Sequence, residues 1–218
     1  MAMAEQILLV EGESDRSFFK EVCKTLGLHP SVKVAPPKDV GGSHNTKEGV
    51  FNHLPILLSQ LGDAEITHLA VVVDADSAVN GGGYQRAIDK VTETVKPYGF
   101  TLASNPVGGV LFQNDDGLAD FGLWVMPNNS DEGMLEDWIK SCVHPDEHEL
   151  FAHAETVVDT LPQTKFKPIH ISKAEVATWL AWQKQPGHGI YRAVEDQLID
   201  TNSVLFKELC IWLTHVYS

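Results

Sequence analysis

The feature that most constrains the fold is an alternation of short apolar runs with segments patterned as helices. The runs 7–10 and 68–73 are too short for buried helices, and they predict strands covered on both faces. Between them, residues 47–61 place apolar side chains at helical spacing. The order β-α-β-α-β-α-β predicts an α/β fold, in which a mostly parallel sheet is flanked by helices. The other elements expected here are helices over 15–26 and 84–95 and strands over 32–35, 100–103 and 122–126, with a loop or hairpin around 114–117.

After residue 130 the pattern turns helical. A proline occurs at each end of segment 162–168, which makes this segment the best candidate joint. We therefore expect an α/β domain over residues 1–162 and a C-terminal helical extension over residues 163–218, packed on it. The helices expected in this half cover 132–140 (with Ser130 as its cap), 146–160, 172–183, 191–199 and 204–216.

Acidic residues follow two of the predicted strands. Glu11 comes directly after the first strand, and Asp74 and Asp76 follow the most apolar one. Ligands and catalysis in open α/β sheets are found beyond the carboxyl ends of the strands, so these three carboxylates are expected to converge. Packing them together is costly without a cation, and oxygen ligands favour Mg²⁺ or Mn²⁺.

The Asp74–Asp76 pair carries a geometric condition. Alternate residues of a continuing strand point to opposite faces, so both carboxylates reach one ion only if the chain turns there. Ala75 and the glycines at 81–83 permit such a turn. Strands that end in aspartate are also common for plain structural reasons, because Asp makes turns and caps helices. The combination with Glu11 is what favours a functional site.

Two segments carry a resemblance to a known family. Residues 8–15 (LLVEGESD) and 71–76 (VVVDAD) resemble the TOPRIM fold, the metal-binding module of topoisomerases, bacterial primases, recombination factors and OLD-family nucleases. Residues 126–128, 133–137 and the tail 173–187 are similar to a family of uncharacterised, TOPRIM-related bacterial and phage proteins. The resemblance covers most of the chain and implies a TOPRIM-like sheet with a C-terminal helical tail.

The resemblance implies roles for particular residues. Glu11 would be a metal ligand or the general acid/base, and Asp74 and Asp76 would hold Mg²⁺ or Mn²⁺. One or two ions are both open, and a later acidic residue would help to hold a second. The candidates for that acidic residue are Glu136, which we favour, and Asp137, and the candidates for the family's basic residue are Lys140 and Lys173.

Two functions follow from this resemblance. The first is a metal-dependent hydrolase of the nuclease type that cleaves phosphodiesters, with DNA favoured over RNA as the partner, in phage defence or DNA repair. The second is a non-catalytic or conditionally active TOPRIM subunit. OLD-type modules work attached to an ATPase, and this chain has no Walker motif, so such a subunit would need a separate ATPase partner. A homo-oligomer is left open.

Charge limits how nucleic acid could be held. The chain has 30 Asp and Glu against 16 Lys and Arg, a net charge of −14, which excludes a charge-driven grip by the whole protein. Residues 113–160 contain twelve acidic residues and one lysine. Residues 161–192 contain five basic residues and one acidic residue. We expect this later segment to contact phosphates or an acidic partner.

The compartment is predicted from absences in the sequence. The three cysteines include no CxxC pair, which favours a reducing compartment. No apolar run is long enough to cross a membrane, and residues 1–6 show no signal-peptide pattern. A cytoplasmic protein without a membrane partner is expected.

Four other functions fit the sequence less well than a TOPRIM-type protein. Zinc binding by Cys142, His144, His148 and His153 is disfavoured by the spacing of the last two, five residues apart. Trp179 and Trp182 could stack on bases, although a core role is favoured. A receiver-like phosphoacceptor would need paired acids on the first strand and a lysine where Pro127 stands. A sugar-nucleotide transferase with a DxD motif usually needs a longer chain.

Overall fold

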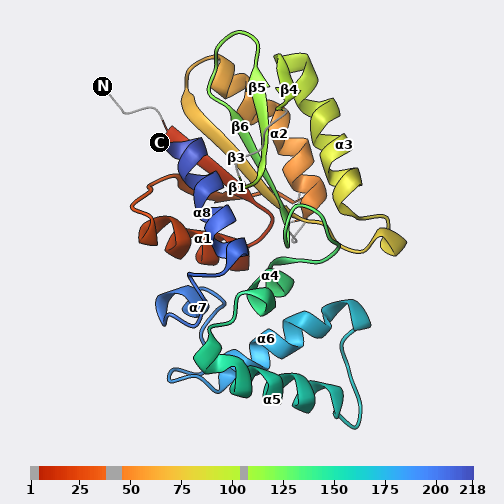
Figure 1. Cartoon of the computed structure of the whole chain (residues 1–218). Coiled ribbons are helices and arrows are strands. Elements are labelled where there is room, and N and C mark those ends of the chain that lie inside the picture. Colours follow the sequence, from red (N-terminus) through yellow and green to blue (C-terminus); the bar gives the residue numbers. More distant parts are fainter. Residues whose placement is uncertain (1–4, 38–45, 104–107) are drawn as a thin grey trace.

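The computed structural model describes residues 5–37, 46–103 and 108–218 (Figure 1). Its centre is a six-stranded sheet in the order β2-β1-β3-β6-β5-β4. The first four strands of that order run parallel, and β5 and β4 add an antiparallel edge. The strands are β1 (Glu5–Val10), β2 (Ser31–Val34), β3 (Ile66–Asp74), β4 (Phe100–Leu102), β5 (Val110–Asn114) and β6 (Phe121–Met126).

Helices cover both faces of this sheet, which confirms the predicted α/β class. Alternate residues of β3 enter two separate cores, with Val72 on one face and Val71 on the other. Burial on both sides explains why the parallel strands are continuously apolar. The covering helices are α1 (Glu13–Thr25) and α8 (Val204–Tyr217) on one face, and α2 (Lys47–Gly62) and α3 (Tyr84–Val95) on the other.

Two glycines bring α8 close to the sheet. A Cβ on Gly122 in β6 would lie 2.6 Å from Val216, and one on Gly109 would lie 2.5 Å from the Trp212 ring. The Trp212 ring packs 5.5 Å from that of Trp124, centre to centre. The Tyr217 hydroxyl donates to the carbonyl of Ile7 at 2.7 Å, which ties the last helix to the first strand.

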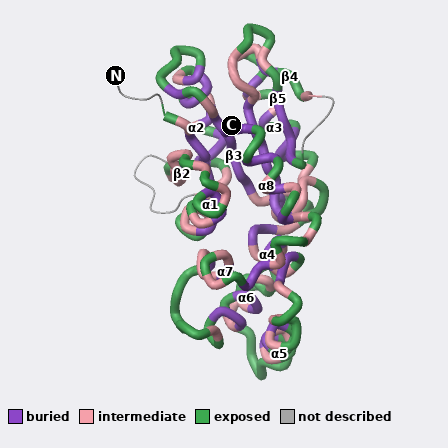
Figure 2. Tube along the Cα trace, turned by 60° about the vertical axis from the view of Figure 1, so that its left-hand side comes forward, coloured by how far each residue is buried: buried purple, intermediate pink, exposed green. Residues whose placement is uncertain are grey.

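The remaining helices lie beyond the carboxyl ends of the strands (Figures 1 and 2). Phe151 of α5 and Trp179 of α6 join these two helices across a 5.3 Å edge-to-face contact. Segment 162–168, which was expected to join the two parts of the chain, therefore connects two helices that pack on each other. Figure 2 shows buried residues in this helical part as well as in the sheet. These helices are α4 (Leu135–Ser141), α5 (His148–Asp159), α6 (Ile171–Ala181) and α7 (Arg192–Glu195).

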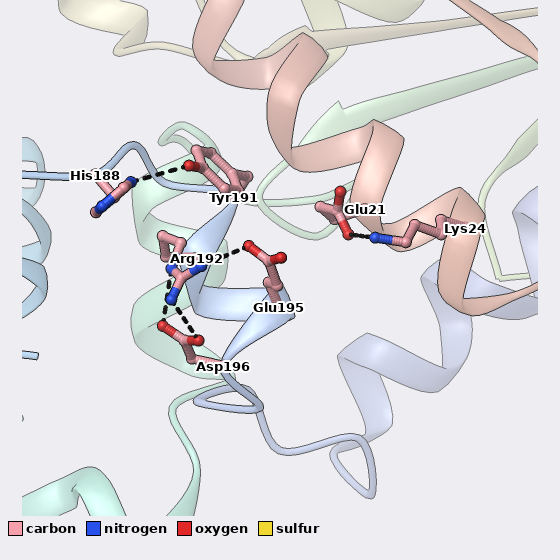
Figure 3. A network of polar contacts seen from close by, with 7 residues as sticks. All are labelled: Glu21, Lys24, His188, Tyr191, Arg192, Glu195 and Asp196. Carbon is pink, nitrogen blue, oxygen red and sulfur yellow. Dashed lines mark hydrogen bonds and ion pairs between the residues drawn. The ribbon is translucent and has the colours of Figure 1, made fainter. Parts of the chain in front are cut away.

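The helix expected over 191–199 is wrong in length, since α7 has four residues. Gln197 adopts a positive φ of 59°, which a continuing helix does not allow. Figure 3 shows what holds this turn: the Arg192 guanidinium pairs with Glu195 and Asp196. On α1, the hydrogen bond from Lys24 to Glu21 raises the pKa of Lys24, and the charge of Glu195 adds to this effect.

Two further differences concern local signals. Ser130 does not cap a helix, because the Asn128 side chain accepts from the N–H groups of Ser130 and Asp131 and forms a separate turn. As a result α4 begins only at Leu135. The hairpin around 114–117 is confirmed, and it adds a strand, β5, that was not predicted. Across the described ranges, no helix combines the length and apolar character needed to cross a bilayer.

Candidate active site at the carboxyl edge of the sheet

Glu11 and Asp74 lie side by side although 63 positions separate them in sequence. Strands β1 and β3 are parallel neighbours, so their carboxyl ends meet at one edge. The backbone N–H of Asp74 donates to Glu11 Oε1 at 2.8 Å. This hydrogen bond fixes the Glu11 carboxylate beside the end of β3.

Asp76 meets the geometric condition set by the sequence. Strand β3 ends at Asp74, and the Ala75 side chain is fully buried. Asp76 then takes a left-handed backbone with φ of 59°, which Asp tolerates better than most residues. Its N–H donates to the carbonyl of Gly133 at 2.9 Å. The chain has therefore turned between the two aspartates.

Glu136 and Asp15 complete an acidic group around Asp74. The N–H of Leu135 donates to Asp74 Oδ1 at 3.1 Å, which places the first turn of α4 at this edge. The charges of Glu136 and Asp15 both act on Asp74. We call Glu11, Asp15, Asp74, Asp76 and Glu136 the carboxylate cluster.

Crowding and burial disfavour negative charge within the carboxylate cluster. Burial raises the pKa of Glu11 from its ordinary 4.5 to about 7, against the hydrogen bond from Asp74 and the charge of Lys47. Burial, followed by the charges of the other four carboxylates, raises the pKa of Asp74 well above its usual range. Burial likewise raises the pKa of Asp15 and Glu136. Positive charge is therefore what this edge lacks.

Two lysines supply part of that charge. Lys47, at the start of α2, forms an ion pair with Asp76 and donates to the carbonyl of Ala75 at 3.2 Å. Lys173, on α6, lies 4.0 Å from Glu136 and acts to lower the pKa values of Glu136 and Asp15. The two lysines thus stand at opposite ends of the carboxylate cluster.

Other candidates have structural partners instead. Asp137 accepts from the N–H of Met134 at 2.9 Å and from the Ser172 hydroxyl, so its carboxylate caps α4 and joins it to α6. Lys140 pairs with Glu155 and Glu175, which ties α4 to α5 and α6. Neither one belongs to the carboxylate cluster.

The residues considered for zinc binding and for base stacking also make structural contacts within the protein. Cys142 is buried and accepts from the Ser203 hydroxyl. His148 contacts the carbonyl of Val143, and the His153 ring lies against Trp182. Trp179 is fully buried, and its indole N–H donates to Glu147 at 2.9 Å. The half-exposed Trp182 covers His153, so neither tryptophan presents both of its faces to solvent.

The carboxylate cluster is a candidate site for a divalent cation. In the parts of the chain that the structure describes, no three acidic, histidine or cysteine side chains are already arranged to hold one. The chemistry of the donors nevertheless suits a hard divalent cation, since all five are carboxylates and burial disfavours the charge of Glu11, Asp15, Asp74 and Glu136. Lys47 takes one oxygen of Asp76, and Leu135 takes one of Asp74. A cation would bind the second oxygen of each aspartate or displace these partners.

Fold and site together define a class: an α/β protein with a mostly parallel sheet and an acidic cluster at its carboxyl edge. The chain belongs to the family described as "Protein of unknown function (DUF3226)", whose profile matches residues 5–218. No curated protein and no solved structure matches the chain. The family match runs from β1 through α8, so the later helices belong to the same family unit as the sheet.

Two members of the site were missed from the sequence. Asp15 lies in the first turn of α1, four residues after Glu11, and its position directly after the first strand could have pointed to it. It also caps α1 by accepting from the N–H of Gly12 at 3.1 Å. Lys47 carries no local signal, because only the packing of α2 against β3 brings it to Asp76.

Proposed function

We propose that this protein is a Mg²⁺- or Mn²⁺-dependent enzyme that cleaves phosphodiesters, a nuclease of the TOPRIM type. The observation that carries the proposal is the convergence of Glu11, Asp74 and Asp76 at the ends of adjacent strands, next to two lysines. Carboxylates gathered in this way favour divalent cations, and phosphodiester chemistry commonly uses such ions. The resemblance of residues 8–15 and 71–76 to TOPRIM motifs supports the same reading.

Each residue has a role in this proposal. Asp74 and Asp76 would hold the cation, with Glu136 available for a second one. Glu11 would either share the cation or take a proton from the attacking water. A bound cation supplies stabilisation for charge on the phosphoryl oxygens. Lys47 and Lys173 would bind the remaining phosphate oxygens from the two ends of the carboxylate cluster.

Cleavage assays test this proposal. Supercoiled plasmid, single-stranded DNA and single-stranded RNA are incubated with the protein and Mg²⁺, Mn²⁺ or EDTA. We expect divalent-dependent cleavage, stronger on DNA, that falls at least about 100-fold in Glu11→Gln and Asp74→Asn. Glu149→Gln, an exposed carboxylate on α5, is the matched control and should leave the rate unchanged. Cleavage that persists in both site variants would contradict the proposal.

A conditionally active subunit is the second candidate. The observation in its favour is that Lys47 already neutralises Asp76 and that no three donors are arranged for an ion within the described ranges. A partner, such as a separately encoded ATPase, could complete the site. Co-purification of an ATPase, with cleavage only in its presence, would support this candidate. Full activity of the isolated chain would refute it.

The nucleic-acid partner would approach along the segment between α5 and α6. Lys165 and Lys167 are exposed there, and Lys173 follows at the carboxylate cluster. Positive charge is thereby concentrated beside an edge that is otherwise acidic. A phosphate backbone laid along this segment would pass the proposed cleavage site. We place the protein in the cytoplasm, in a role in phage defence or DNA repair.

A further inference from the structure

A cavity of about 600 Å³ lies between α2 and α3 and begins at Asp76. Its walls carry Lys47 and Phe51 from α2 and Arg86 from α3. Ile169 reaches it from the 3-10 turn η4 (Pro168–His170), which precedes α6. Small-molecule sites occupy roughly 300–1,000 Å³, so the size suits a ligand larger than an ion.

The glycines at 81–83 shape one end of this cavity. A Cβ on Gly82 would lie 2.6 Å from the carbonyl of Ala75, so only glycine lets the loop fold against the turn at Asp76. Gly83 caps α3 without a side-chain hydrogen bond. The first N–H groups of a helix have no partner inside it, and they carry partial positive charge. The first turn of α3 therefore offers backbone N–H donors to an anion.

Arg86 stands in the first turn of α3, and Lys90 lies one turn further along the helix. Arg86 and Lys90 line the cavity, and neither forms an ion pair with another residue in the described ranges. The Arg86 guanidinium lies over Gly81, where an added Cβ would approach it to 3.1 Å. Among the acidic residues of the walls, Asp89 already accepts from Gln85 at 2.7 Å. Arg86 is therefore available to pair with an anion at this end, although the cavity as a whole is lined by four carboxylates and three cations.

The rest of the wall has a different chemistry. Phe51 and Ile169 offer apolar contact, and Ile169 is 36 % exposed. Glu48 and Glu93 add carboxylate acceptors. The cavity thus combines an anion-binding end, an apolar wall and acceptors for N–H groups. A phosphate, a planar base and an exocyclic amine satisfy these three features in one molecule.

We propose that this cavity binds a nucleoside 5′-monophosphate unit, with its phosphate at Arg86 and the start of α3 and its base against Phe51 and Ile169. The inference rests on the proposed function in one respect: it assigns the cavity to the nucleotide next to the bond that is cleaved. Because the cavity begins at Asp76, a strand entering it passes the carboxylate cluster.

The test measures binding without catalysis. AMP, inorganic phosphate and adenosine are titrated into the metal-free protein in EDTA by calorimetry. AMP is expected to bind with a Kd of about 0.1–1 mM and at least about tenfold more tightly than phosphate or adenosine. Equal affinity for phosphate and AMP would overturn the assignment of the apolar wall. No AMP binding would overturn the site itself.

Two variants separate the two halves of the ligand. Arg86→Gln should weaken AMP and phosphate about tenfold each. Ile169→Ala should weaken AMP about threefold and leave phosphate unchanged. Lys96→Gln, an exposed cation at the other end of α3, is the control and should change neither. AMP affinity unchanged in both cavity variants would overturn the proposal.

Competition links the cavity to a strand. AMP should displace a fluorescent single-stranded oligonucleotide from the metal-free protein, and a failure to compete would overturn the placement of the cavity on the strand's path. The outcomes also separate the two proposals. AMP binding without any cleavage under Mg²⁺ or Mn²⁺ refutes the proposed function and leaves the nucleotide site intact. Cleavage without AMP binding refutes the nucleotide site and leaves the proposed function intact.

Discussion

Glu11 keeps a carboxyl group in a place that disfavours its charge. The cause of its raised pKa is burial, to which the charges of Asp76 and Asp15 add; the hydrogen bond from the Asp74 N–H and the charge of Lys47 only partly offset it. A group of this kind makes the folded state prefer the proton. Its ionisation should therefore cost the metal-free protein stability, which can be measured apart from any activity.

Replacing Glu11 by Gln should stabilise the metal-free protein at alkaline pH. The pKa is about 7 in the folded chain against an ordinary 4.5, so the stabilising contribution of protonated Glu11 is full below about 4.5 and is lost as pH rises through 7. Gln still accepts from the N–H of Asp74 and cannot ionise. Urea unfolding in EDTA should show Glu11→Gln more stable than wild type by on the order of 1–2 kcal/mol at pH 8, and no more stable at pH 4.

Glu13→Gln serves as the control for this measurement, since Glu13 is exposed at the start of α1, two residues after Glu11. It should change stability by less than about 0.5 kcal/mol at either pH. A Glu11→Gln protein that gains nothing between pH 4 and pH 8 would contradict the expectation.

Lys47 should compete with a divalent cation for Asp76. Removing its charge in Lys47→Gln is expected to tighten Mn²⁺ binding about 3- to 10-fold, because a nearby positive charge repels the ion. Cleavage should still fall at least about tenfold, since Lys47 is proposed to bind phosphate. Calorimetry and a cleavage assay read the two effects separately. Weaker Mn²⁺ binding would mean that Lys47 supports the ion, and Lys20→Gln, exposed on α1, should alter neither quantity.

The sequence showed which strands end in acidic residues, but it did not show which side chains lie next to those residues. Glu11, Asp74 and Asp76 were predictable because parallel strands bring their carboxyl ends to one edge. Lys47 was not, because its contact depends on how α2 lies over the sheet. Glu136 was a candidate only through the family resemblance of residues 133–137, and the backbone contact of Leu135 with Asp74 is what brings α4 to this edge.

Among the elements, α8 packs closely on the sheet at Gly109 and Gly122. Gly122 permits it, so Gly122→Ala should destabilise the fold by about 1–3 kcal/mol through overpacking against Val216. Adding Val216→Ala should recover part of that loss, since it removes the methyl group that clashes. Urea unfolding followed by tryptophan fluorescence measures both variants.

Gly62→Ala is the matched control for that measurement. A Cβ at Gly62, the last residue of α2, meets no atom within 4 Å. Helix propensity predicts that this variant is as stable as wild type or more so, by up to about 1 kcal/mol. A Gly122→Ala protein that unfolds at the wild-type urea concentration would show that α8 shifts at little cost.

Periodicity predicted the central strands and the long helices because burial on both faces or on one stripe leaves a regular pattern. It failed where local chemistry decides the boundary. The Asn128 turn delays α4, and the positive φ of Gln197 cuts α7 short. Strand β5 is short and polar at its end, and only its pairing with β4 and β6 makes it a strand.

The net charge of the whole molecule has the opposite sign to the one that DNA binding by charge alone would require. The net charge is −14, yet the segment between α5 and α6 is basic. Lys165→Glu with Lys167→Glu should weaken single-stranded DNA binding about tenfold and flatten its salt dependence. Mn²⁺ binding should stay unchanged, because neither residue belongs to the carboxylate cluster. Unaltered DNA affinity would contradict this path, and Lys207→Glu on α8 is the control.

The hydrogen bond from Tyr217 to Ile7 joins residues 210 positions apart. Contacts this distant in sequence close large loops, which slows folding. Until α8 has been synthesised, the face of β3 and β6 that it covers stays open to other chains. The sheet should therefore reach its native packing only after α8 has been synthesised.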